Sequence, residues 1–330
     1  MRALVTGATG FIGSHLVPKL LKDGYKVRCL TRKASSLEKV SGLPVELYTG
    51  DLSAPGSLVE AVRGVDYIFH LAGLTKTNED REFYDVNARG TRNLVETAAR
   101  ENPGLKKFIY LSSLAAAGPV LEDLTPLTEE VLPHPVSHYG KSKLLGEKAV
   151  SEAAGKFPVI IMRPTAVYGP GDRDFYLLFK MIKKGIFLYW GMSHYSLIYV
   201  EDLVRAIAAA ATAGMECGKE KPKIYFLSDG NIYSNLEIAA AIAQAMPWAK
   251  REKPVRIPVP RFLLPVAAAF SGIGGRDSGI INRDKLREMR FKNWCCSAER
   301  ARSEIGFEPL ITLKEGVKWT ADWYRSHQWI

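Results

Sequence analysis

Two groups of side chains in the middle of the chain have the types and spacing to move a proton to or from an alcohol oxygen. Tyr139 and Lys143 are four residues apart, so a helix would place them on one face, one turn from each other. A tyrosine with an ordinary pKa of about 10 is a poor base at neutral pH, but a neighbouring ammonium and an oxidised nicotinamide favour its phenolate. The serines Ser112 and Ser113, which follow an expected strand at 107–111, offer a hydroxyl to hold a substrate oxygen. Together these residues predict a proton shuttle for hydride transfer at the attached carbon.

Such chemistry needs a hydride carrier, and the beginning of the chain has the pattern of a dinucleotide turn. Residues 6–13 read Thr-Gly-Ala-Thr-Gly-Phe-Ile-Gly, between an apolar run at 3–5 and a helical pattern at 14–20. The three glycines permit a tight turn, a close approach of backbone to a diphosphate, and close helix–strand packing. The helix N-terminus offers unpaired N–H groups and a positive dipole end to the phosphates. We expect the cofactor to contact Gly7, Thr9, Gly10, Phe11, Ile12 and Gly13.

The end of the second expected strand, at 26–30, indicates which dinucleotide fits. A carboxylate about 20 residues beyond the glycine turn would bind the ribose hydroxyls of NAD and repel the 2′-phosphate of NADP. No acid stands between Asp23 and Glu38, and Arg32 is placed to pair with that phosphate. The alternative is that Arg32 and Lys33 point into water. The sequence favours NADP(H) over NAD(H).

Two further strand ends add candidate cofactor contacts. The third strand, at 44–48, leads to Asp51 and Leu52, which can meet the adenine amine and ring, although Asp51 also suits a plain helix cap. The fourth strand, at 67–70, runs into small residues that leave room for a ribose. His70 and Asn87 are interpreted as a satisfied buried histidine and a helix-facing asparagine. The small residues after the fourth strand are Leu71, Ala72 and Gly73.

The alternation of strands and helices predicts the fold class. Helical patterns at 11–23, 55–63 and 82–100 separate the apolar strand runs. This order predicts an α/β protein with a Rossmann-type, doubly wound parallel sheet and right-handed crossovers. We assign residues 1–171 to a dinucleotide-binding domain, to which some later segments return. Residues 172–330 are assigned mainly to a smaller, mixed α/β substrate-binding domain, because the alternation breaks up there.

Within the second part, patterns are less regular. A strand at 223–227 and helices at 201–211, 235–245, 297–301 and 312–324 are expected. The aromatic residues between 187 and 199 are interpreted as core rather than as a cover for a substrate ring. The apolar stretch 261–270 predicts a helix that closes a pocket or joins the core, with a membrane surface as the alternative.

Composition narrows the class of protein. Lysine and arginine outnumber aspartate and glutamate by 45 to 35, without a block of like charges, which favours an anionic small-molecule substrate and argues against nucleic acid. The four cysteines have neither disulfide nor zinc spacing, so we expect a reducing cytoplasm. The longest apolar stretch, 262–273, is interrupted by Pro265, so no membrane span is expected. Because the cysteines lack zinc spacing, no metal site is expected either.

The chain resembles the extended short-chain dehydrogenases/reductases, the NAD-dependent epimerase/dehydratase family. The resemblance rests on the glycine pattern at 6–13, on Asp51-Leu52, and on Tyr139 with Lys143. It implies that Ser113, counted back from Gly118, is the catalytic serine and that Ser112 is structural. It also implies that Tyr139 and Lys143 contact the cofactor, Lys143 at the nicotinamide ribose, and that the chain forms a homodimer. The segment 163–171 would border cofactor and substrate, with Pro164 and Val167 at the cofactor.

Two departures from the family and one closer similarity narrow the reaction. Dehydratases carry Asp-Glu where Leu114-Ala115 stand, and epimerases commonly carry asparagine where Ala166 stands. The segments RPTAVYGPGD and SSLAAAGP resemble the corresponding sequences of the branch that contains 3β-hydroxysteroid dehydrogenases and dihydroflavonol reductases. We therefore predict an NAD(P)-dependent oxidoreductase acting on a secondary alcohol or ketone. A nucleotide-sugar 4-epimerase with tightly bound NAD is the alternative, and a non-catalytic dinucleotide sensor ranks below it because Tyr139 and Lys143 are present.

Overall fold

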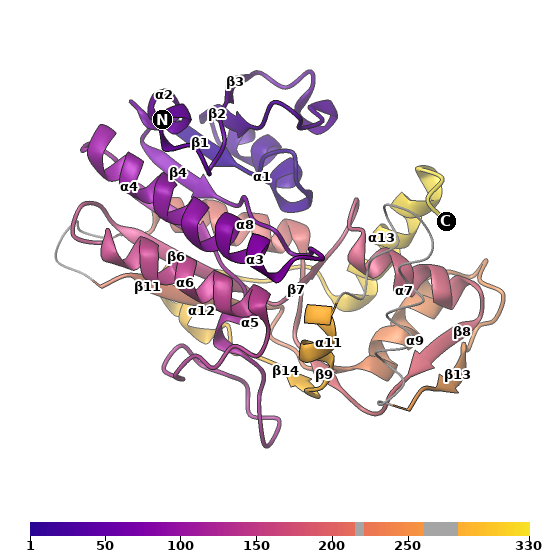
Figure 1. Cartoon of the computed structure of the whole chain (residues 1–330). Helices are drawn as coiled ribbons and strands as arrows, with labels where there is room; N and C mark the ends of the chain where they lie inside the picture. The colour runs from indigo at the N-terminus through magenta and orange to yellow at the C-terminus, as the bar shows by residue number, and fades with distance from the viewer. Residues whose placement is uncertain (215–220, 261–282) are drawn as a thin grey trace.

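The computed structural model describes residues 1–214, 221–260 and 283–330. Its centre is one sheet of seven strands in the order β11-β6-β5-β4-β1-β2-β3, and every neighbouring pair is parallel (Figure 1). This sheet confirms the predicted Rossmann-type fold. The strands are β1 (Arg2–Thr6), β2 (Lys26–Thr31), β3 (Val45–Thr49), β4 (Tyr67–His70), β5 (Lys107–Leu111), β6 (Val159–Pro164) and β11 (Lys223–Leu227).

Helices cover both faces of the sheet, as a doubly wound fold requires. One face packs against α1 (Phe11–Lys22), α8 (Val200–Thr212) and α12 (Glu299–Ile305). The other packs against α2 (Val59–Val62), α4 (Thr91–Glu101) and α6 (His138–Glu152). The strand order reverses between β1 and β4, and ligands of open α/β sheets bind at the carboxyl ends of the strands beside such a reversal.

Two expected helices differ in detail. The expected helix at 55–63 is a 3₁₀ turn, Pro55–Leu58, followed by α2. The expected helix at 82–100 is α3 (Asp80–Phe83), a π-helical stretch Tyr84–Gly90, and α4. The expected helix at 261–270 lies outside the described residues. Between β5 and α6 the chain adds one short helix, α5 (Leu114–Ala117).

A second hydrophobic cluster forms the smaller part of the molecule. It is built on α7 (Asp174–Lys183), α9 (Asn235–Ala245) and α13 (Leu313–Ser326), with α11 (Arg283–Met289) nearby (Figure 1). Short strands pair as β10 with β7, as β13 with β8, and as β12-β9-β14. Phe187 and Tyr199 are buried in this cluster, which confirms the core interpretation for these two aromatic side chains. These strands are β7 (Ala166–Tyr168), β8 (Ile186–Tyr189), β9 (His194–Tyr195), β10 (Leu197–Tyr199), β12 (Tyr233–Ser234), β13 (Val255–Pro258) and β14 (Asn293–Trp294).

Some later segments belong to the large sheet rather than to the smaller part. Strand β11 pairs with β6, and α8 packs under the sheet beside α1. No helix in the described ranges is long and apolar enough to span a bilayer. Of the cysteines that the structure describes, Cys29, Cys295 and Cys296 are free and buried.

The turn between β1 and α1 is built around its glycines. Gly7 has φ +72°, which favours glycine, and a Cβ there would lie 2.7 Å from the Ala72 nitrogen. A Cβ on Gly13 would lie 2.1 Å from the Gly7 carbonyl oxygen. That oxygen also accepts a hydrogen bond from the Gly10 N–H at 2.9 Å. The helix can therefore begin only because residue 13 has no side chain.

Gly13→Ala should destabilise the chain by about 1–3 kcal/mol, since the added methyl group forces helix and turn apart. Chemical denaturation monitored by circular dichroism measures the change. Gly155→Ala is the matched control, because nothing lies within 4 Å of a Cβ at that position. Equal stability of the two variants would contradict the close packing described for the turn.

Candidate active site

The structure places the predicted serine and tyrosine in contact. Ser113 precedes α5, and its side-chain oxygen accepts a hydrogen bond from the Ala115 N–H at 3.1 Å. Tyr139 lies in the first turn of α6, which Ser137 caps by accepting from the Gly140 N–H at 3.0 Å. The Ser113 hydroxyl lies near enough to Tyr139 to lower the pKa of its phenol. Two oxygens are thus brought together at the carboxyl edge of the sheet, from segments 26 residues apart in the sequence.

The two adjacent serines, Ser112 and Ser113, have different neighbours. Ser112 is buried, and its hydroxyl donates to Glu147 Oε1 at 2.5 Å. Glu147 in turn accepts from Arg163 Nε and Nη2 at 2.9 and 2.6 Å, and both charged side chains are buried. Successive side chains of an extended segment point to opposite sides. Ser112 therefore joins an internal ion pair while Ser113 faces Tyr139.

Lys143 is buried one helical turn beyond Tyr139. Its ammonium donates to the Leu111 carbonyl oxygen at 2.6 Å and lies 4.3 Å from the centre of the Tyr110 ring. Burial lowers the pKa of Lys143 to about 7, against a smaller raising effect of Glu147. The lysine of the protein alone is therefore near the midpoint of its titration at neutral pH.

The acidification of Tyr139 by Lys143 together with an oxidised nicotinamide stays a prediction. Burial raises the pKa of Tyr139 to about 12, and the hydrogen bond with Ser113 offsets only part of that rise. The Lys143 ammonium, which donates to the Leu111 carbonyl, does not offset this burial. A phenolate at Tyr139 needs positive charge beyond what this chain supplies.

The segment after β4 connects the glycine turn to Lys143. A Cβ on Gly73 would lie 3.8 Å from Lys143 Nζ and 2.9 Å from Asn87 Oδ1. Asn87 accepts from the Leu74 N–H at 2.7 Å and donates to the Leu74 carbonyl and to Ser142 Oγ, both at 2.9 Å. This buried amide, expected only to face its helix, instead ties the segment after β4 to α6.

The residues of the turn fit a dinucleotide. A Cβ at Gly7 or Gly13 would fill the turn, and the first N–H groups of α1 have no intrahelical acceptor and no side-chain cap. Four of the predicted contact residues pack against one hydrophobic cluster beside this turn, namely Phe11, Ile12, Leu71 and Val167. Thr9 is half-buried in the turn, and Pro164 is the last residue of β6. His70 is buried between Thr6 and Thr91, with hydrogen bonds of 2.7 and 2.9 Å, as its interpretation required.

The residues expected at the adenosine end lie beyond β2 and β3. Arg32 is exposed directly after β2. The Asp51 carboxylate accepts from the Ser53 N–H and hydroxyl at 2.8 and 2.7 Å, and these bonds, helped by the charge of Arg32, lower its pKa. The Leu52 carbonyl accepts from Asn93 at 2.7 Å. Asp51 thus closes a turn with Ser53 and is not the helix cap that was its alternative interpretation, because the following 3₁₀ helix begins after Ala54. The charge of Arg32 acts on the Asp51 carboxylate.

Helix α11 holds the first turn of α6, which sequence patterns did not indicate. The Asp284 carboxylate accepts from the backbone N–H groups of His138 and Tyr139 at 2.7 and 2.9 Å. The Ser137 hydroxyl donates to Glu288 Oε1 at 2.8 Å. Asp284 and Glu288 are both buried and one turn apart, a spacing that could have marked a capping pair. Their partners lie about 150 residues away, so the sequence could not locate them.

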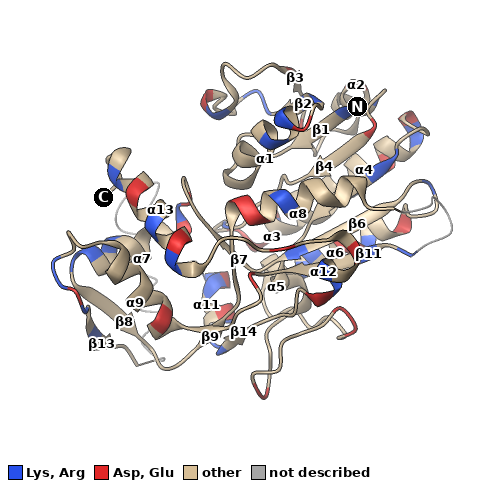
Figure 2. Cartoon of the chain, turned by 180° about the vertical axis from the view of Figure 1, so that it is seen from behind, with Lys and Arg blue, Asp and Glu red and all other residues tan. Residues whose placement is uncertain are grey.

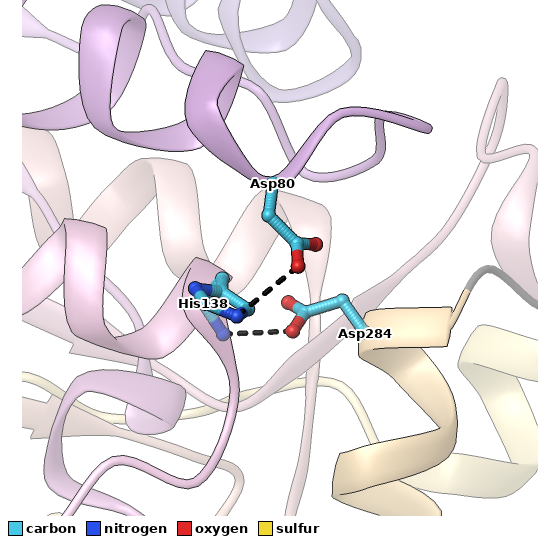
Figure 3. Close-up of side chains that lie close together, drawn as sticks. All are labelled: Asp80, His138 and Asp284. Atoms are coloured by element: carbon cyan, nitrogen blue, oxygen red, sulfur yellow. Dashed lines mark hydrogen bonds and ion pairs between the residues drawn. The ribbon is translucent and has the colours of Figure 1, made fainter.

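Figure 3 shows the outer side of this contact, where Asp80, His138 and Asp284 converge. His138 Nε2 lies 3.1 Å from Asp80 Oδ2, and His138 Nδ1 lies 2.7 Å from the Tyr84 hydroxyl. Arg287 contacts both carboxylates, at 3.5 Å from Asp80 and 2.8 Å from Asp284. The guanidinium thus supplies the positive charge that a metal ion would bring to these oxygens.

Comparison with known proteins matches the same part of the chain. The model of the NAD dependent epimerase/dehydratase family matches residues 3–225. The chain belongs to this family. The predicted resemblance to extended short-chain dehydrogenases/reductases is confirmed, and so is the prediction that the protein is an enzyme.

Individual relatives have different reactions in their names. A ceramide reductase of Caulobacter vibrioides is 33% identical, covering 99% of this chain and 95% of the relative. A UDP-glucose 4-epimerase of Vibrio cholerae is 30% identical, covering 96% and 94%. A Thermus thermophilus UDP-glucose 4-epimerase solved with NAD has a TM-score of 0.78 over 98% of this chain and 99% of that one, at 22% identity, which supports the fold.

Asp284→Ala should lower the free energy of unfolding by about 1–2 kcal/mol, since two N–H groups at the start of α6 lose their acceptor. Urea denaturation of the purified parent protein and of the variant measures the change. Asp322→Ala, an exposed aspartate on α13, should stay within about 0.5 kcal/mol of the parent. If both substitutions had the same small effect, the proposed hold of α11 on α6 would be refuted.

Proposed function

We propose that this protein transfers hydride between NAD(P)(H) and the carbon of a secondary alcohol or ketone. The observation that carries the proposal is the proximity of the Ser113 and Tyr139 side chains beside buried Lys143, whose ammonium donates to the Leu111 carbonyl at the end of β5. This group lies at the carboxyl edge of the sheet, next to the segment that packs on the glycine turn. The nicotinamide, when bound, supplies or accepts the hydride and adds positive charge in its oxidised form.

Ser113, Tyr139 and Lys143 have different roles in this proposal. Ser113 donates a hydrogen bond to the substrate oxygen and fixes the reacting carbon. In the oxidation direction Tyr139 takes the hydroxyl proton as hydride leaves the carbon, and in reduction it returns that proton to the oxygen. Lys143, when protonated, stabilises the phenolate and binds the nicotinamide ribose. The raised pKa of Tyr139 keeps the phenol of the chain alone protonated at neutral pH, which is the form that the reduction direction starts from.

The substrate we propose is a small molecule of low polarity with a hydroxyl or keto group. Support comes from Leu114 and Ala115, buried apolar residues at the positions where dehydratases carry an acid pair. Relatives named for reduction or dehydrogenation of lipid-like molecules also match, including a 3 beta-hydroxysteroid dehydrogenase/Delta 5-->4-isomerase of Mycobacterium tuberculosis at 27% identity. The cytoplasmic location and the homodimer stay predictions.

A nucleotide-sugar 4-epimerase is the second candidate. The 30% identity to a UDP-glucose 4-epimerase supports it, and the same three side chains serve that reaction. The alternatives differ in cofactor turnover. An oxidoreductase consumes added NADPH or NADH in step with substrate, whereas an epimerase converts UDP-sugars with no net change in the dinucleotide. A thermal-shift screen over nucleotide sugars and lipid-like ketones, with each dinucleotide, selects the substrate for this assay.

Tyr139→Phe should reduce turnover by at least about 10²-fold, because the proton donor and acceptor is lost while the ring stays against Phe83. Dinucleotide-linked absorbance measures turnover, and dinucleotide binding should persist. Tyr25→Phe, directly before β2, removes a phenol without a hydrogen-bond partner among the described residues, at the opposite edge of the sheet, and should keep full activity. Full activity of Tyr139→Phe with its own substrate would refute the role of Tyr139.

We propose NADP(H) as the preferred cofactor, supported by exposed Arg32 after β2. Arg32→Asp should lower the ratio of NADP to NAD affinity by about tenfold or more, because a charge-assisted hydrogen bond is replaced by repulsion. Lys26→Asp makes the same charge change at the opposite end of β2 and should leave the ratio unaltered. Fluorescence titration with both dinucleotides measures it, and an unchanged ratio in Arg32→Asp would remove Arg32 from the cofactor site.

A further inference from the structure

The positive charge of this protein is concentrated on one edge of the smaller part. Two short segments, 180–184 and 250–256, carry seven cationic side chains against one carboxylate, Glu252. They supply more than half of the chain's excess of ten positive charges. Within the described part of the chain, none of the seven has an ion-pair partner. The seven, which we call the basic edge, are Lys180, Lys183, Lys184, Lys250, Arg251, Lys253 and Arg256.

The two segments form one continuous surface. The Lys250 N–H donates to the Lys183 carbonyl oxygen and the Val255 N–H to the Gly185 carbonyl oxygen, both at 2.9 Å. Arg251 lies over Gly185, where an added Cβ would come within 3.0 Å of its side chain. Figure 2 shows the resulting blue margin along α7 and β13, away from the large sheet. The charges are held together by the fold.

Apolar side chains are exposed among these cations. All four residues of β13 are exposed, and Val255 and Ile257 show 45% and 39% of their surfaces. Four of the lysines also surround a cavity of about 500 Å³ that is lined further by Trp329 and Ile330. Cations mixed with exposed aliphatic side chains are typical of proteins that rest on a membrane surface.

We propose that the basic edge binds the surface of an anionic lipid bilayer. The cations would pair with lipid phosphates while Val255 and Ile257 enter the boundary between headgroups and acyl chains. A nucleic acid offers phosphates but no apolar phase for these two side chains, so a bilayer suits the whole surface better. This inference does not depend on the reaction catalysed, since the basic edge is separate from Ser113, Tyr139 and Lys143.

Co-sedimentation of the full chain with vesicles tests the proposal. The protein should partition to phosphatidylcholine vesicles containing phosphatidylglycerol and not to phosphatidylcholine alone. The triple variant Lys180→Gln, Lys183→Gln, Lys184→Gln should weaken partitioning by roughly 100-fold, at about fivefold for each charge. The matched triple variant Lys22→Gln, Lys26→Gln, Lys148→Gln removes three exposed charges from the large domain and should weaken it far less.

Two further arms identify the ligand. Ile257→Ser should weaken vesicle binding at unchanged charge, and inorganic phosphate at the lipid concentration should not displace the protein. Equal loss in both triple variants would show general charge attraction and overturn the proposal. Displacement by phosphate, no effect of Ile257→Ser, or tighter binding to duplex RNA than to the vesicles would each overturn it as well. Circular dichroism confirms that every variant is folded.

Discussion

The burial of the Lys143 ammonium is the physical constraint on which this site depends. The ammonium is held by one carbonyl oxygen and the face of one aromatic ring, and burial still brings its pKa to about 7. Each unit of pKa shift corresponds to about 1.4 kcal/mol between protonation states, so the protein holds this cation at an appreciable cost. A ligand that restores hydrogen bonds or negative charge near Lys143 would be favoured for the same reason. Without a cofactor, the site is therefore better suited to binding a ligand near Lys143 than to transferring a proton.

The geometry around Lys143 is set by segments that meet from distant parts of the sequence. The glycine turn packs on Ala72, the next residues pack on Asn87, and Asn87 bonds to Ser142 of α6. From the other side, Asp284 and Glu288 of α11 hold the start of the same helix. Tyr139 therefore stands on a helix that is connected to the glycine turn through Ala72 and Asn87 and to α11 directly. Movement of the glycine turn or of α11 would therefore shift the Tyr139 hydroxyl.

Much of this fold could be predicted from local pattern. Apolar runs of four to six residues, separated by helical periods and glycines, sufficed for the strands and their parallel order, because burial on both faces leaves a clear signal. The spacing of Tyr139 and Lys143 was also within reach. The distinction between Ser112 and Ser113 came from the resemblance to the family and not from local pattern. What could not be predicted depends on tertiary burial. The raised pKa of Tyr139, the Glu147–Arg163 pair and the capping by Asp284 arise from partners that no local pattern specifies.

The central claim is that Tyr139 becomes a usable base only when positive charge from both Lys143 and an oxidised nicotinamide acts on it. The ultraviolet difference titration of tyrosinate between the parent and Tyr139→Phe, with and without saturating NADP⁺ or NAD⁺, measures this directly and needs no substrate. We expect Tyr139 of the chain alone to ionise near pH 12. With oxidised cofactor we expect its pKa to fall below the ordinary value of about 10, and Lys143→Met to remove most of that fall. A pKa that stays near 12 with cofactor bound, or a fall that persists in Lys143→Met, would contradict the account.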